Sequence, residues 1–223
     1  MLNQYQLQSE YRPEIDGLRA LAVVLVIINH FNYKILPSGY LGVDIFFVIS
    51  GYVITSSIIS RLKKKSNINI KTFIFDFYRR RFKRLLPVLI IFVLLTSILI
   101  SFFNPDSLVQ LRSGITSLFG LSNLYFIKIS SDYFSESTSM MPFAHTWSLG
   151  VEEQFYFLFP LIISASGIIK NKHNSINKLK FILCLLAVPS LILFIYLYPI
   201  NQGLAYYLMP TRFWEIAVGC LTF

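Results

Sequence analysis

Apolar residues occur along this chain in long stretches that are separated by short polar or basic segments. The stretches long enough, or nearly long enough, to span a bilayer cover about 15–33, 41–60, 85–103, 147–169 and 180–199, with a sixth over about 205–223. Runs of about 20 apolar residues are typical of transmembrane helices. The pattern therefore predicts an all-α, polytopic membrane helical bundle with five complete spans and a sixth partial span.

Charge sets the expected orientation of these spans. The chain is 55% hydrophobic and 14% charged, whereas soluble domains carry about 25% charged residues. Residues 61–84 hold ten Lys or Arg and one acid, Asp76, and residues 170–180 hold four lysines and no acid. The positive-inside rule places both segments in the cytoplasm, and with them the N-terminus.

Residues 108–127 are apolar but include Arg112, Ser113 and Gly114. If this segment crossed the membrane, the basic segment 170–180 would lie outside, against the charge rule. We therefore expect an interfacial or re-entrant helix on the outer side.

Ionisable residues lie inside the first apolar stretch. Arg19 and His30 are eleven residues apart, so on a helix they lie within roughly 20° of one face and about 16 Å apart along the axis. Asp16 and Arg19 form an i,i+3 pair. Such groups are costly in a membrane helix and are candidates for function. The simpler alternative for Asp16 and Arg19, as for Glu14, is that they cap the start of the helix and reach the interface.

His30 is the candidate general base. A tight hairpin between the first two stretches would bring Asp44 close to His30. We expect Asp44 to hydrogen-bond one ring nitrogen and to leave the other as a base. The alternative for His30 is a satisfied polar residue at the interface.

A basic run from Tyr78 to Pro87 precedes the third stretch. Arg81 and Arg84 are i,i+3 on the expected helix, so both can bind one polyphosphate at the membrane surface. A positive-inside anchor with affinity for anionic lipid is the alternative. Nucleic acid is not an expected partner, because no stacking platform or folded basic domain accompanies the charges.

Polar residues also open the fourth stretch. His145 and Glu152 are seven residues apart and lie within about 20° on a helix. Burying Glu152 and the adjacent Glu153 in a span costs roughly 2.5–3.5 kcal/mol each on insertion scales. We therefore expect His145, Glu152 and Glu153 to bind substrate, together with Asp16 of the first stretch.

Arg212 and Glu215 are i,i+3 in the sixth stretch, and they are most simply a buried ion pair that holds helices together. The sequence contains no Walker A loop, paired cysteine ligands or G-x-S-x-G elbow. It predicts no metal site and no tightly bound cofactor.

Together these motifs resemble the acyltransferase-3 family of bacterial integral-membrane acyltransferases. The resemblance rests, in order, on 12–22 (Arg-Pro-Glu-Ile-Asp-Gly-Leu-Arg-Ala-Leu-Ala), His30, 42–52 (Gly-Val-Asp-Ile-Phe-Phe-Val-Ile-Ser-Gly-Tyr), the basic run to Pro87, and 145–156 (His-Thr-Trp-Ser-Leu-Gly-Val-Glu-Glu-Gln-Phe-Tyr). It implies transfer of an acyl group, usually acetyl from acetyl-CoA, to a hydroxyl of a cell-surface polysaccharide or glycolipid such as O-antigen. The family's basic-residue-x10-His motif falls on Arg19 and His30, and its RxxR motif on Arg81 and Arg84.

The resemblance also implies a place in the bacterial inner (cell) membrane, with the bilayer, an acyl-CoA donor and a surface glycan acceptor as partners. On this view Arg81 and Arg84 hold the CoA phosphates, while His30 deprotonates the acceptor or carries the acyl group. Residues 1–223 then form the N-terminal part of the membrane domain, with no appended soluble domain. A transporter or lipid-binding membrane protein, or an inactive remnant of an acyltransferase, are the alternatives.

Overall fold

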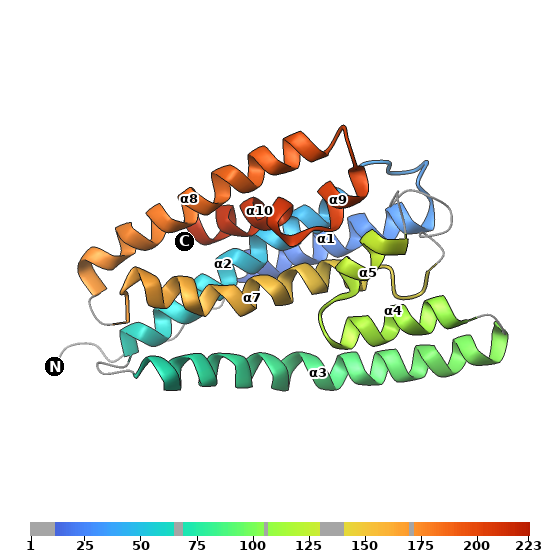
Figure 1. Ribbon diagram of the computed structural model, residues 1–223, viewed down its shortest axis with the longest axis horizontal. Coiled ribbons are helices and arrows are strands. Elements are labelled where there is room, and N and C mark those ends of the chain that lie inside the picture. Colours follow the sequence, from blue (N-terminus) through green and yellow to red (C-terminus); the bar gives the residue numbers. More distant parts are fainter. Residues whose placement is uncertain (1–11, 65–68, 105–106, 130–140, 170–171) are drawn as a thin grey trace.

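The computed structural model describes residues 12–64, 69–104, 107–129, 141–169 and 172–223 (Figure 1). In these residues the regular elements are α-helices, and no strand occurs, so the predicted all-α class is confirmed for them. The helices are α1 (Pro13–Phe31), α2 (Leu41–Lys64), α3 (Ile70–Phe103), α4 (Leu108–Leu118), α5 (Ser122–Ile129), α7 (Thr146–Ser166), α8 (Lys172–Leu197), α9 (Gln202–Tyr207) and α10 (Met209–Leu221). Lys65 and Lys170 of the two basic segments lie outside the described residues.

Three of the described helices have the length and composition of membrane spans: Leu41–Leu62 of α2, Ile70–Phe103 of α3 and Ser175–Leu197 of α8. With 19 and 21 residues, α1 and α7 are also long enough to cross, but they carry ionisable residues along their length. The sixth predicted stretch is divided at Leu208 into α9 and a 13-residue α10. Pro210 lies in the first turn of α10, where its missing N–H is tolerated. Five complete spans and a cytoplasmic N-terminus therefore stay predictions.

Residues 108–127, which are expected to form an interfacial or re-entrant helix, lie in two short helices. With 11 and 8 residues, α4 and α5 are each too short to cross a bilayer. Between them, Gly120 has a φ of 66°, a left-handed conformation that glycine adopts without strain. In Figure 1, α4 lies along α3, and α5 packs against α7. The segment thus forms no single helix long enough to cross, and its interfacial or re-entrant place on the outer side stays a prediction.

The core of the bundle is centred on α7. Every fourth residue of this helix is buried, namely Trp147, Val151, Phe155, Phe159 and Ile163. By contrast, only 11% of the residues in the most apolar 18-residue segment of α3 are buried, and only 17% of those in the corresponding segment of α8. These two long helices thus present apolar faces outward, which is the pattern of helices that face lipid.

Two glycines allow α2 and α10 to cross in backbone contact. A Cβ atom added at Gly51 would lie 1.9 Å from the carbonyl oxygen of Ile216, and one added at Gly219 would lie 1.8 Å from that of Val48. Small residues of this kind let membrane helices approach closely. The crossing brings side chains of α10 against the start of α2.

We expect Gly219→Val to lower the free energy of unfolding by at least about 1–3 kcal/mol, the usual cost of overpacking. The new side chain would overlap the backbone of α2. Thermal unfolding of the purified chain in detergent measures this effect. Gly17→Ala is the matched control, because an added Cβ there meets nothing within 4 Å. An unchanged unfolding temperature for Gly219→Val would contradict this helix crossing.

Candidate functional site

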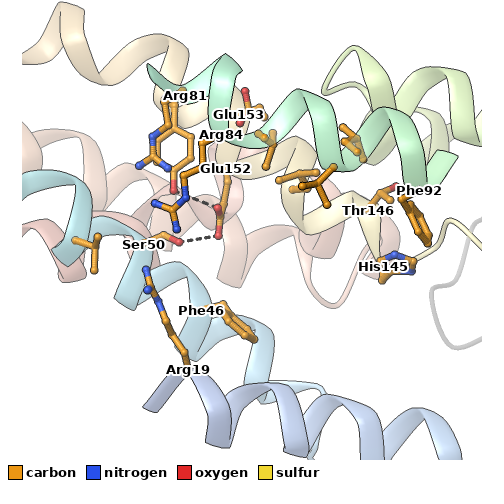
Figure 2. Close-up of a pocket in the computed structure, with 16 residues that line it drawn as sticks. Arg19, Phe46, Ser50, Arg81, Arg84, Phe92, His145, Thr146, Glu152 and Glu153 are labelled. Carbon is orange, nitrogen blue, oxygen red and sulfur yellow. Dashed lines mark hydrogen bonds between the residues drawn. The ribbon is translucent and has the colours of Figure 1, made fainter. Parts of the chain in front are cut away.

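A cavity of about 490 Å³ lies between α1, α2, α3 and α7 (Figure 2). Six of the predicted site residues line it: Arg19, Arg81, Arg84, His145, Glu152 and Glu153. Figure 2 shows the arginines and Glu152 gathered at one end, while His145 and Phe92 lie at the other. Among the described residues, no group of three or more His, Cys, Asp or Glu side chains is placed to hold a metal ion. The structure thus brings together polar residues from distant segments in one elongated space.

Arg81 and Arg84 reach the cavity because α3 is continuous. The helix starts after Asn69, whose side chain accepts a hydrogen bond from the Lys71 amide, and it continues to Phe103. The two arginines are therefore one turn apart. The guanidinium of Arg81 lies 3.9 Å from the ring centroid of Tyr156, a cation–π contact. Within the described part of the chain, neither arginine has a carboxylate within 4.0 Å, so both keep donors for an anion.

Two hydroxyl groups hold the Glu152 carboxylate in the cavity wall. Ser50 Oγ of α2 donates to Oε1 at 2.7 Å, and the Tyr156 hydroxyl donates to Oε2 at 3.1 Å. The Ser50 bond ties α2 to α7, and the two bonds fix a carboxylate that has no ion pair among the described residues. Ser50 is a site residue that the sequence reading missed. The available signal was a hydroxyl residue beside Gly51 and six residues after Asp44, in a largely apolar stretch.

The predicted pair between Asp16 and Arg19 is confirmed: Arg19 Nη1 lies 3.3 Å from Asp16 Oδ1. Arg19 lines the cavity, whereas Asp16 is not part of its wall. Asp16 is thus connected to the site through its ion pair with Arg19. The hairpin that brings α1 beside α2 is tight, since a Cβ added at Gly42 would lie 2.5 Å from the carbonyl oxygen of Ala22.

His30 lies in the last turn of α1, is exposed, and is not part of the cavity wall. Its Nδ1 is 2.9 Å from the carbonyl oxygen of Val26. A carbonyl only accepts, so Nδ1 carries the proton in this contact, and Nε2 of the neutral ring keeps its lone pair. Desolvation, and then repulsion from nearby His30, lower the pKa of His145 below its usual value. His145 is thus part of the cavity wall, whereas His30 is not.

The predicted hydrogen bond between Asp44 and His30 is wrong. Asp44 Oδ1 instead accepts from Arg212 Nη2 at 2.9 Å, and Arg212 Nη1 donates to Glu215. A guanidinium gives a carboxylate a stronger, charge-assisted bond than a neutral imidazole does. The crossing of α2 and α10 places that guanidinium within reach. The predicted pair of Arg212 and Glu215 is confirmed, with Asp44 as its third member.

Comparison with known proteins gives two kinds of match. Residues 12–223 match a family model described as an acyltransferase domain, that of the acyltransferase-3 family. The chain is 37% identical over 212 residues to the O-acetyltransferase OatA of Staphylococcus aureus (strain NCTC 8325 / PS 47). It is 37% identical over 214 residues to the putative O-acetyltransferase SAS0844 of S. aureus (strain MSSA476). Each match covers 95% of this chain and 34% of the relative, so the chain spans about a third of their length. No solved structure gives a significant match.

Proposed function

The chain belongs to the acyltransferase-3 family, and from this premise we propose that it transfers an acetyl group from acetyl-CoA to a hydroxyl group of a cell-surface glycan. The relatives are named as O-acetyltransferases, which supports acetyl as the group transferred and oxygen as the atom that receives it. A multi-pass place in the cell membrane is part of the proposal and is supported by the three long apolar helices.

The observation that carries this proposal is a pair of arginines in the cavity wall, neither of which has a carboxylate within 4.0 Å among the described residues. Arg81 and Arg84 are one helical turn apart and face a space of about 490 Å³, within the usual range for small-molecule sites. Guanidinium groups bind phosphate through paired, charge-assisted hydrogen bonds. The phosphates of acetyl-CoA therefore suit this end of the cavity.

The length of α3 supports entry of acetyl-CoA into the cavity from the cytoplasm. Its 34 residues extend over about 51 Å, whereas the hydrocarbon core of a bilayer is about 30 Å thick. The apolar part after Arg84 is long enough to cross, so the basic first half extends beyond the core. By the positive-inside rule this half lies on the cytoplasmic side, where acetyl-CoA is made.

His30 is proposed to act at the acceptor. Its Nε2 removes the proton from the acceptor hydroxyl while the oxygen attacks the thioester carbonyl carbon. The C–S bond then breaks, the CoA thiolate leaves, and the proton returns from the imidazolium to the thiolate or to water. Such general-base assistance contributes about 10²–10⁴-fold. The carbonyl of Val26, rather than Asp44, supports the ring in this scheme.

We expect Arg81→Gln and Arg84→Gln each to weaken acetyl-CoA binding at least about tenfold, because each removes charge-assisted bonds to phosphate. Equilibrium binding of radiolabelled acetyl-CoA to the purified chain in detergent measures this. Arg112→Gln is the matched control, since Arg112 is an exposed arginine of α4 outside the cavity wall. An equal affinity for acetyl-CoA in the unmodified chain and in all three variants would reject the donor site and favour a transporter or lipid-binding role.

A further inference from the structure

A second cavity, of about 520 Å³, lies between α3 and α7 beside the first one. The two cavities share three wall residues, Arg81, Glu153 and Tyr156. Because the Arg81 guanidinium stacks on the Tyr156 ring, this pair forms part of the partition between the two spaces. One ligand that passes this pair could occupy both cavities.

Aromatic residues make up much of the second cavity's wall. Tyr78 and Phe82 are stacked with an interplanar angle of 26°, and Tyr78 lies at 31° to Phe157. The Tyr78 hydroxyl donates to the Phe157 carbonyl oxygen at 2.7 Å, which fixes the ring of Tyr78 against α7. Phe82 and Phe157 are 49% and 63% exposed. Exposed aromatic rings of this kind are platforms on which a planar base stacks.

Cations accompany the rings. Arg79 and Lys83 are i,i+4 on α3, are exposed, and line the second cavity but not the first. Neither has a carboxylate within 4.0 Å among the described residues. Together with the shared Arg81, they offer binding groups for phosphate oxygens beside the ring faces. All three belong to the first half of α3, the part that extends beyond the apolar segment.

We propose that the second cavity binds the nucleotide part of the donor, with adenine on the rings of Phe82 and Phe157 and the ribose phosphate on Arg79 and Lys83. This inference rests on the proposed function, since it extends the same acyl-CoA from the first cavity past Arg81. The pyrophosphate lies at the arginine pair, and the pantetheine arm enters the first cavity. A phospholipid headgroup would share the phosphate chemistry, but it has no planar base to use the rings.

The test compares three soluble probes on the full purified chain in detergent: CoA, adenosine 3′,5′-bisphosphate, and acetyl-phosphopantetheine, which lacks the nucleotide. Phe82→Leu removes a ring, and the double variant Arg79→Gln/Lys83→Gln removes the cations. The controls are Phe102→Leu, an exposed ring elsewhere on α3, and Arg80→Gln, an exposed arginine that lines neither cavity. Phe82→Leu and the double variant should weaken CoA and adenosine bisphosphate at least about tenfold. Both should leave acetyl-phosphopantetheine within about twofold.

Several results would overturn the nucleotide subsite. The first is an unchanged CoA affinity in both variants. The second is a loss of acetyl-phosphopantetheine affinity as large as the loss of CoA affinity. The third is competition with CoA by phosphatidylglycerol vesicles but not by adenosine bisphosphate. The last would assign the cavity to a lipid headgroup. If the unmodified chain bound no CoA at all, the proposed function would fail together with the subsite. CoA binding that both variants retain would reject the subsite alone.

Discussion

Replacing Arg212 with Met should lower the free energy of unfolding by about 3–5 kcal/mol, the usual cost of breaking a buried ion pair from one side. Arg212 is 3% exposed and binds both Asp44 and Glu215. Its removal leaves two carboxylates near each other with no counter-charge. Chemical unfolding in detergent micelles, followed by circular dichroism, measures the loss.

A second variant separates charge from packing. The triple change Arg212→Met, Asp44→Asn and Glu215→Gln removes all three charges, and it should recover a large part of the lost stability. Arg112→Met, at an exposed position of α4, should stay within about 0.5 kcal/mol of the unmodified chain. If Arg212→Met unfolded at the same denaturant concentration as the unmodified chain, the cluster would not hold α2 and α10 together.

His30→Ala should reduce acetyl transfer by about 10²–10⁴-fold, the range of general-base assistance. It should leave acetyl-CoA binding within about twofold, because His30 is not part of the cavity wall that holds the arginines. The side chain is exposed and its polar contact is local, to Val26. We therefore expect normal amounts of folded protein. Rates and binding constants measured on the same preparations separate the chemical step from donor binding.

Phe31→Ala is the matched control for His30→Ala, since Phe31 is the next residue and is 88% exposed. It should change neither rate nor affinity by more than about twofold. A His30→Ala protein with the normal transfer rate would show that another group activates the acceptor. Equal losses in binding and transfer would instead assign His30 to the donor site.

Local patterns in the sequence predict the helices and the residues spaced along each one. The apolar stretch over about 15–33 corresponds to α1 (Pro13–Phe31), and the i,i+3 spacing of Arg81 and Arg84 places both on one cavity wall. Periodicity is a property of one helix, so such predictions need no knowledge of neighbours. This is why the arginine pair could be predicted from the sequence.

Contacts between distant helices could not be predicted in the same way. Asp44 and Arg212 are 168 residues apart, and Ser50 and Glu152 are 102 residues apart. The crossing that brings Arg212 to Asp44 depends on close contacts at Gly51 and Gly219, which join α2 to α10 across the length of the chain. A prediction from the short hairpin alone therefore pairs Asp44 with His30 instead of Arg212.

The most direct test of the central claim follows the acetyl group itself. Membranes containing the chain, and membranes lacking it, are supplied with radiolabelled acetyl-CoA, and the label on surface glycan and the release of free CoA are both measured. We predict labelled glycan, removed by mild base as expected for an O-ester, with one CoA released for each acetyl group transferred. Acetyl-CoA consumption no greater than in membranes without the chain, and no label on glycan, would contradict the account.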